Sequence, residues 1–474
     1  MATSENATLR NPERWITGGV FLLYCLYLPF SGYSEMVYDG LNYWTLTERF
    51  FQDGRFSLLA YDDALRGYFL PLLNLPAKAV THFTGLAPLH LTRLMGAACA
   101  ALLFGWAAPA LWRALFPQHI LGWSPRIAFA ALGFLFWRDH FNFVLSDFPA
   151  LLALLLSLRL AVRGGSWWYA FLAGAGLMAA YNIRPVYLLA APVLVVLTLV
   201  ATAGVGRRIA ALGGLVLGCM LISGPQLLMN GRHHGLWTPL VLSRDARLPT
   251  ANLYLAQLGW GLVVQKYETS LDPSSPSPRM LYTDAAGQAL RQRRSMHHFG
   301  SYGAYAAAVA HEPLAFAALY GRHLFNGLDV QYPTLFVLDT EQRSGWLALL
   351  HYSVWFGALL VIGSGRYSRP TALRVGLAAV ALLLPCLASL PIAIECRFLL
   401  PLQLVLYAAA CFGGAQLQWG HHRWVWPRLA AVVIAYGVFL LLCFTLSART
   451  HAQLTYDVGV LAPLGGAEVP TKKP

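Results

Sequence analysis

Charged residues are scarce in this sequence. Only 12% of the 474 residues are Asp, Glu, Lys or Arg, and 57% are hydrophobic, whereas about a quarter of the residues in a soluble globular chain are charged. This composition excludes an ordinary soluble protein. It indicates that lipid surrounds most of the folded chain.

Acidic residues are fewer than basic ones, with 21 Asp and Glu against 34 Lys and Arg, and the formal net charge is +13. A nucleic-acid-binding protein would gather its basic residues on one face. Here they are spread between apolar segments. Their distribution therefore indicates membrane topology, and we expect membrane lipids but no nucleic acid among the partners.

Several common motifs are missing as well. None of the seven cysteines has the spacing of a metal site or of a disulfide framework. No small-residue cleavage site follows the first apolar run, from Trp15 to Phe30, so we expect a retained helix rather than a cleaved signal peptide. No internal repeat stands out, and the inverted repeats of many transporters therefore have no support.

Apolar runs are what the sequence has in quantity. Eleven of them approach or reach the length of about 20 residues that a membrane-spanning helix needs. They lie at about 15–32, 90–112, 125–143, 149–163, 167–182, 186–203, 209–228, 346–363, 372–393, 398–417 and 429–447. We therefore predict an all-α polytopic membrane protein, a single bundle of about 11 transmembrane helices over residues 1–474.

The arginines between these runs predict the sidedness of the bundle. If the amino terminus is cytoplasmic, every inner segment is basic, whereas the short outer turns hold mainly Arg138, Arg184 and Arg397. The inner arginines are Arg10, Arg14, Arg113, Arg126, Arg159, Arg163, Arg207, Arg208, Arg366, Arg369, Arg374, Arg423 and Arg428. Because basic residues favour the cytoplasmic side, we predict a cytoplasmic amino terminus and a carboxyl terminus outside.

Two outer segments are too long to be simple turns. The first, 33–89, is predicted to hold two short surface helices, one of them from Asn42 to Phe51. The second, 229–345, is polar and contains a Pro- and Ser-rich stretch that begins at Asp272. Functional residues tend to lie in such loops, because a rigid scaffold positions them.

Two acids at the outer ends of apolar runs are candidates for chemistry. Asp39 lies beside aromatic residues just beyond the first run, where a carboxylate can act as a general base. Asp147 lies at the start of the fourth run, two residues before Pro149. Both also fit an ordinary helix start, because Asp caps free backbone N–H groups and Pro favours the first helical turn. From the residues alone, both interpretations stay open.

Cations at the same side suit a departing phosphate, because Arg binds phosphate through a bidentate fork. Arg184 lies between two apolar runs. Inserting a lone Arg at membrane depth costs about 2.5–3.5 kcal/mol, so an Arg there rarely lacks a role. Its alternative role is to reach lipid headgroups. Arg397 has Glu395 two residues away, and their alternative role is a structural ion pair at a helix end. Arg138 and His140 lie in the same short turn. Charged residues in an exposed turn usually only contact solvent, so these two are weaker candidates.

The order of several short motifs resembles that of a known class. The acid-bearing first loop is followed by the run from Gly67 to Leu73 and by the run from Leu91 to Gly96, which opens the second span. The run from Glu395 to Pro401 has the pattern acid-x-Arg-aromatic-x-x-Pro, and His311-Glu312-Pro313 precedes the last helices. This order is similar to that of the GT-C glycosyltransferases. It resembles especially the order in the bacterial relatives of protein O-mannosyltransferases and of the lipid A aminoarabinose and galacturonic acid transferases.

The resemblance implies a GT-C-like bundle with two long periplasmic loops and an inverting glycosyltransferase. Such an enzyme takes a sugar from a polyprenyl-phosphate donor and passes it to lipid A, to O-antigen or another polysaccharide, or to protein. The reaction would take place at the outer face of a bacterial inner membrane. Loop 33–89 would hold the catalytic acid, and loop 229–345 would bind acceptor or donor.

Residue by residue, Asp39 matches the first-loop catalytic acid of the class, and Asp147 matches its second acid. Many members carry an acidic pair in the first loop, but here Gly40 follows Asp39. Where close relatives have Lys before the loop proline, this chain has Leu70. Arg66 and Lys78 lie nearby, and either could take the place of that Lys, although the exact donor contact does not transfer. The further candidates for donor phosphate binding are Arg184, Arg397 and Arg138, and those for acceptor binding or support are Glu395, Asp62, Asp63, Tyr38, Tyr43 and His140. Some members use a divalent metal ion, and no motif here decides for or against one.

Two other classes of function fit a polytopic membrane protein. A transporter or lipid-linked sugar flippase would place charged or Gly- and Pro-broken positions at mid-span, in two related halves. A non-catalytic membrane assembly protein would need no such positions. The unusual acids and arginines of this chain instead gather on one side, which favours chemistry at the outer surface.

Overall fold

The computed structural model describes residues 12–248, 251–294, 296, 298–341, 343–365, 368–414 and 425–456. Of the arginines that predict sidedness, Arg10, Arg366 and Arg423 and the side chain of Arg428 lie outside the described residues, as does the carboxyl terminus. The chain is mostly helical and divides into two compact units. The first comprises Met1–Val241, Gly357–Pro385 and Leu404–Leu417, and the second comprises Leu242–Phe356, Cys386–Gln403 and Gln418–Pro474.

The first unit is a bundle of apolar helices. Its amino-terminal part comprises α2 (Pro12–Tyr27), α5 (Pro88–Ala100), α6 (Ala108–Leu115), α7 (Trp123–Trp137), α8 (Asp147–Arg163), α9 (Trp167–Ile183), α10 (Ala191–Ala201) and α11 (Val205–His234). A π-helical segment, Ala101–Ala107, makes α5 and α6 one continuous rod. Most of α17 (Arg369–Ser389) and α18 (Leu400–Phe412) also belongs to this unit.

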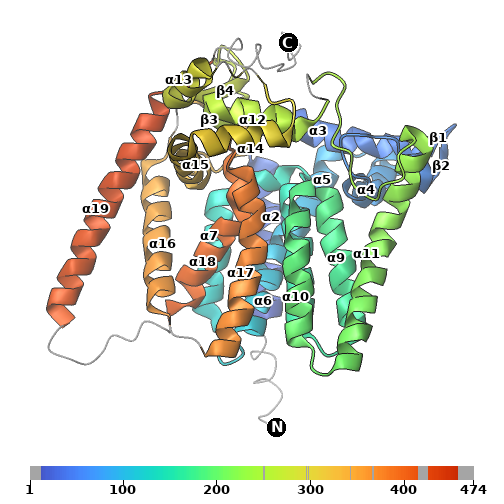
Figure 1. Ribbon diagram of the computed structural model, residues 1–474, viewed down its shortest axis with the longest axis horizontal. Helices are drawn as coiled ribbons and strands as arrows, with labels where there is room; N and C mark the ends of the chain where they lie inside the picture. The colour runs from blue at the N-terminus through green and yellow to red at the C-terminus, as the bar shows by residue number, and fades with distance from the viewer. Residues whose placement is uncertain are drawn as a thin grey trace. The chain divides into compact units, whose positions relative to one another are not determined.

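Helices α9, α10 and α11 run side by side (Figure 1). The contact between α9 and α11 depends on glycines, because a side chain on Gly214 or Gly218 of α11 would collide with the carbonyl oxygens of Trp167 or Phe171 on α9. Small residues let helix backbones approach closely where no water drives them together. Helix α11 continues to His234, beyond the predicted end at 228, and stops where Gly235 adopts the left-handed conformation (φ +67°) that commonly ends helices.

The predicted surface helices of segment 33–89 are present with different bounds. Helix α3 covers Tyr38–Thr45 and is followed by a 3₁₀ turn, Leu46–Phe50, so it begins before the predicted Asn42. Phe51 already belongs to a hairpin of β1 (Phe51–Gln52) and β2 (Arg55–Phe56). The second helix, α4, covers Phe69–Thr84. The helix prediction fails at Phe51 because the left-handed turn at Asp53 and Gly54 folds the chain back.

The second unit combines helices with a small sheet. Its helices are α12 (Leu253–Val263), α13 (Ala285–Arg293), α14 (Tyr302–His311), α15 (Pro313–Leu328), the first part of α16 (Gly345–Ser364) and α19 (Val425–His451). Strands β3 (Val264–Thr269), β4 (Arg279–Thr283) and β5 (Leu454–Thr455) form an antiparallel sheet in the order β3-β4-β5. The sheet is a small addition to a chain that is mostly helical, as predicted.

Within the part of the chain that the structure describes, five helices are long and apolar enough to cross a membrane by length and composition. They are Pro88–Leu115, Val205–His234, Gly345–Ser364, Arg369–Ser389 and Leu429–His451. Each of the eleven predicted runs contains a helix. The chain is therefore a helical protein with the features of a membrane protein, and the number of eleven crossings stays a prediction.

Candidate functional site

Asp39 lies in the first turn of α3, where the partial positive charge of the helix amino terminus stabilises a carboxylate. The side chain is half-buried. Tyr38 begins the helix with a positive φ of 46°, and burial raises the pKa of its phenol. Asp39 is thus presented from a fixed helix start rather than from an unstructured loop.

Gly40 explains why Asp39 has no acidic neighbour. A Cβ atom at this position would lie only 2.9 Å from Cδ1 of the Phe143 ring, and Phe143 is itself buried. The first turn of α3 therefore packs directly on the residues that precede α8. A second carboxylate at position 40 has no room.

Asp147 and Arg184 form a buried ion pair. Asp147 is the first residue of α8, and Arg184 directly follows α9. Nη1 of Arg184 contacts Oδ1 of Asp147, and the two side chains are 17% and 2% exposed. Because α8 and α9 are antiparallel neighbours, the start of one helix meets the end of the next. Charges buried to this degree are expensive to separate.

The loop before α4 contacts both of these regions. The guanidinium of Arg66 lies 5.4 Å from the ring centre of Tyr43, one helical turn after Asp39 on α3. Gly67 packs so closely on Asn182 that no side chain would fit. Asn182 lies two residues before Arg184, and its Oδ1 accepts a hydrogen bond of 2.7 Å from the backbone N–H of Phe69.

These contacts bring four segments of the first unit together, a region that we name the Asp147 end. It comprises α3, the loop from Tyr61 to Phe69, the start of α8 and the end of α9. Buried amides support it, because Asn182 donates to Gln226 and Gln226 donates to Asn230, each over 3.0 Å. Asp39, Arg66 and the Asp147–Arg184 pair are therefore held at one end of one unit.

Arg93, at the start of the second predicted span, has a structural part in this arrangement. It is 8% exposed, and it donates to the carbonyl oxygen of Tyr33 over 2.7 Å and to Oδ1 of Asn142 over 2.9 Å. The Tyr33 ring packs edge-on against Phe143 at 5.3 Å. Arg93 thus fastens the segment before α3 to the segment before α8.

The acids of the first loop have local partners. Asp62 pairs with Arg49 at 2.7 Å on the surface. Asp63 accepts hydrogen bonds from the backbone N–H groups of Leu65 and Arg66, at 2.9 and 2.6 Å. Asp63 therefore shapes the turn that presents Arg66.

Lys78 and the turn after α7 are also engaged locally. Lys78 pairs with the exposed Glu48 at 2.5 Å. Arg138 donates to the Tyr27 hydroxyl over 2.9 Å, and that hydroxyl donates to Asp139 over 2.8 Å. His140 is 2% exposed, and its ring packs against Trp137 and Phe148.

Glu395 and Arg397 belong to the second unit. Nε of Arg397 donates to Oε2 of Glu395 over 2.7 Å, and the two side chains are 14% and 20% exposed. The structural ion pair considered as an alternative is therefore present. It lies just before α18.

The second unit also holds a buried polar network that the sequence did not suggest. Lys266 has no exposed side-chain surface, pairs with Glu268 at 3.0 Å and donates to the backbone oxygen of Asp329 over 2.9 Å. Burial opposes its charge, but the neighbouring carboxylates of Glu268 and Asp329 outweigh burial and raise the pKa of Lys266. Asp329 in turn accepts from Tyr352. Lys266 lies in a strand, Val264–Thr269, in which apolar and polar residues follow no clear alternation, so the sequence carries no local signal for this network.

Among the residues that the structure describes, no group of three or more His, Cys, Asp or Glu side chains is arranged to hold a metal ion. No protein-family model matches the sequence, and no curated protein matches it either. The Asp147 end combines a half-buried carboxylate, Asp39, with a fixed guanidinium, Arg184, at the same end of the unit. Groups of these two kinds can accept a proton and stabilise an anion.

Proposed function

We propose that the chain is an inverting membrane glycosyltransferase of the GT-C class, which moves a sugar from a polyprenyl-phosphate donor to an acceptor hydroxyl. The acceptor would be a glycan, a lipid or a protein. The observation that carries the proposal is the Asp147 end, where Asp39 and the buried Asp147–Arg184 pair occupy one end of the first unit. A general base and a phosphate-binding cation are the two groups that this transfer needs.

In the proposed reaction, the Asp39 carboxylate removes the proton from the acceptor hydroxyl. The acceptor oxygen attacks the anomeric carbon on the face opposite the phosphate, so the configuration inverts. The bond between that carbon and the phosphate oxygen breaks, and the electron pair leaves with the polyprenyl phosphate. The proton stays on Asp39 until it passes to water.

Arg184 would stabilise the departing phosphate. Its guanidinium carries five N–H donors, more than one carboxylate uses, so it can bind Asp147 and a phosphate oxygen together. Asp147 would then act as a positioning residue that holds the cation in place. Arg66, beside Tyr43, is the second cation suited to the phosphate.

The proposal depends less on the other candidate residues. Lys78 and Arg138 are paired with Glu48 and Tyr27, which favours structural roles. Arg397 and Glu395 keep the role that the family resemblance implies, and a structural ion pair is the simpler explanation of their contact.

The proposal includes eleven crossings of a bacterial inner membrane, with a cytoplasmic amino terminus and the Asp147 end facing the periplasm. Reaction of engineered cysteines with a membrane-impermeant thiol reagent tests this orientation. Ser274→Cys should react in intact cells stripped of the outer membrane, whereas Gly206→Cys should react only after the inner membrane is opened. The reverse pattern would contradict the orientation.

Transfer assays on the purified full chain test the activity. Its own polyprenyl-phosphate sugar, extracted from the source membranes, serves as donor, and release of free polyprenyl phosphate is measured. Asp39→Asn should lower the rate by about 10²–10⁴-fold, the usual loss when a general base is removed. Asp53→Asn is the matched control, because Asp53 lies in the same loop at an exposed left-handed turn that Asn also adopts.

An unchanged rate in Asp39→Asn would remove Asp39 as the base. If the unaltered protein releases no polyprenyl phosphate but moves lipid-linked sugar across vesicle membranes, the flippase interpretation would replace the proposal.

A further inference from the structure

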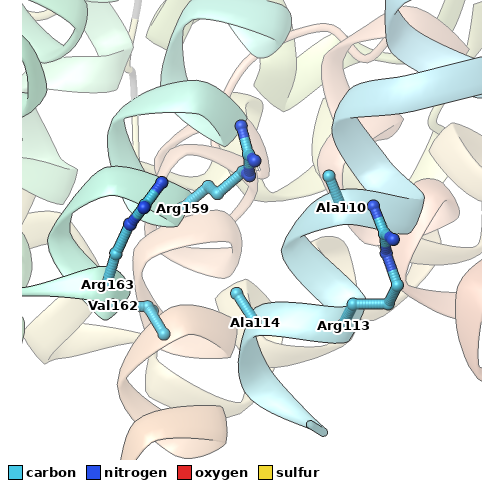
Figure 2. A pocket seen from close by; sticks show the side chains of 6 residues that line it. All are labelled: Ala110, Arg113, Ala114, Arg159, Val162 and Arg163. Atoms are coloured by element: carbon cyan, nitrogen blue, oxygen red, sulfur yellow. The ribbon is translucent and has the colours of Figure 1, made fainter.

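The opposite end of the first unit holds a cavity that the proposed reaction does not use. It has a volume of about 440 Å³ and is lined by Ala110, Arg113, Ala114, Arg159, Val162 and Arg163 (Figure 2). We name this region the Arg159 end. The volume lies within the range of about 300–1,000 Å³ that is typical of ligand sites.

Three guanidinium groups surround this cavity. Arg159 and Arg163 lie one turn apart on α8 and form one wall, while Arg113, on α6, forms the facing wall (Figure 2). The rest of the lining is small and apolar. A cavity with cations on two sides and small apolar residues between them suits a ligand that joins an anionic group to an apolar group.

These arginines are only partly neutralised. Arg113 forms an ion pair with Glu13 on α2. Arg159 and Arg163 have no carboxylate partner among the residues that the structure describes. They lie instead against aromatic rings, with Arg159 5.1 Å from the ring centre of Trp106 and Arg163 4.5 Å from that of Tyr169. A contact with a ring face holds the guanidinium in place and leaves N–H donors for a ligand.

A fourth cation, Arg126 at the start of α7, adds to the positive charge of this part of the unit. It is 2% exposed and donates to the carbonyl oxygen of Leu121 over 3.2 Å. Its Nη1 atom has no hydrogen-bond partner among the described residues. The positive-inside rule accounts for arginines at this side of a membrane protein, but it does not require them to surround one cavity.

We propose that the cavity at the Arg159 end binds the phosphate group of an anionic amphiphile, with an anionic phospholipid of the inner leaflet as the occupant that fits its setting. Arg159 and Arg163 would bind the phosphate oxygens from one side and Arg113 from the other, since guanidinium forks match phosphate geometry. Basic pockets between helices at the cytoplasmic side commonly take such headgroups. The proposal goes beyond glycosyl transfer and stands if that activity is absent.

Lipid binding to the purified full chain tests the proposal. Native mass spectrometry measures retention of phosphatidylglycerol and of zwitterionic phosphatidylcholine by the same detergent-solubilised sample. The test variant is Arg159→Gln with Arg163→Gln, and Arg163→Gln alone is the milder version, because Arg163 is exposed. The control is Arg14→Gln with Arg207→Gln, which removes two exposed charges from the same end without altering the cavity lining.

The unaltered protein and the control should bind phosphatidylglycerol more tightly than phosphatidylcholine. The double variant should bind phosphatidylglycerol about tenfold more weakly or worse, since losing one charge-assisted hydrogen bond has about that effect. Equal binding by the double variant, or an equal loss in the control, would overturn the proposal.

Inorganic phosphate, added without lipid, distinguishes the source of the phosphate group. If it binds the unaltered protein and the double variant loses this binding, the site takes a soluble phosphate compound. If it neither binds nor displaces phosphatidylglycerol, the lipid is the ligand. If neither phosphate nor phosphatidylglycerol binds, the cavity is not a phosphate site.

Discussion

The two ends of the first unit contain arginines in opposite settings. At the Asp147 end, Arg184 is largely buried and paired with a carboxylate that is almost completely buried. At the Arg159 end, Arg159 and Arg163 lie on aromatic rings beside an open cavity, with no carboxylate partner among the described residues. One cation is fixed by its counter-charge, whereas the other two keep donors for a ligand.

This difference separates two uses of the same residue type. A fixed cation at the same end as the proposed general base, Asp39, suits the proposed reaction, because the charges need no rearrangement when the transition state forms. Cations held only by aromatic faces suit binding of an anion supplied from outside. Substitutions at each end test this difference.

The largest effect on stability is expected at the Asp147 end. Arg184→Ala would leave Asp147 as an uncompensated buried charge and should reduce the free energy of unfolding by about 3–5 kcal/mol. Arg294→Ala breaks the exposed pair with Glu312 and should cost at most about 1 kcal/mol. Thermal unfolding of the detergent-solubilised variants, followed by circular dichroism, measures both.

A double replacement shows whether the pair serves stability or chemistry. Asp147→Leu with Arg184→Met removes both charges and keeps apolar volume, so the stability should recover most of the loss. Release of polyprenyl phosphate should not recover. Full activity in a stable double variant would show that the pair takes no part in the reaction.

An intermediate effect is expected at Gly40. Gly40→Ala places a methyl group against the Phe143 ring and should cost about 1–3 kcal/mol, the usual range for overpacking. Gly18→Ala, a matched change inside α2 with nothing within 4 Å of the new Cβ, should not destabilise. Equal stability of the two variants would mean that α3 does not pack on Phe143 as described.

The smallest effect on stability is expected at the Arg159 end. Arg159→Gln with Arg163→Gln removes two contacts with aromatic rings, each worth about 0.5–1 kcal/mol at exposed sites. The midpoint of unfolding should therefore shift far less than in Arg184→Ala. A comparable loss would show that these arginines hold the bundle together, and their free donors would then need another explanation.

The helices were predictable because their apolar runs are long and are bounded by charged residues and glycines. The pairing of Asp147 with Arg184 was within reach of the sequence, since two adjacent antiparallel helices place the start of one beside the end of the other. Considered alone, Asp147 fits a catalytic acid or a helix cap, and Arg184 fits a phosphate-binding cation or a headgroup anchor. Neither interpretation includes the counter-charge on the neighbouring helix.

Other features could not be read from local patterns. Strand β4 pairs with β5, which lies about 170 residues further along the chain, and a two-residue strand carries almost no periodicity. The absence of a second acid at Gly40 has a physical cause in Phe143, a contact between segments about 100 residues apart. Contacts of this kind depend on the packed fold rather than on the neighbouring sequence.

The most direct test of the central claim is an experimental structure of the full chain with a polyprenyl phosphate bound. We expect the phosphate group at the Asp147 end, within hydrogen-bonding distance of Arg184 and next to the Asp39 carboxylate. A polyprenyl phosphate bound elsewhere on the chain, with Arg184 contacting only Asp147, would contradict the account.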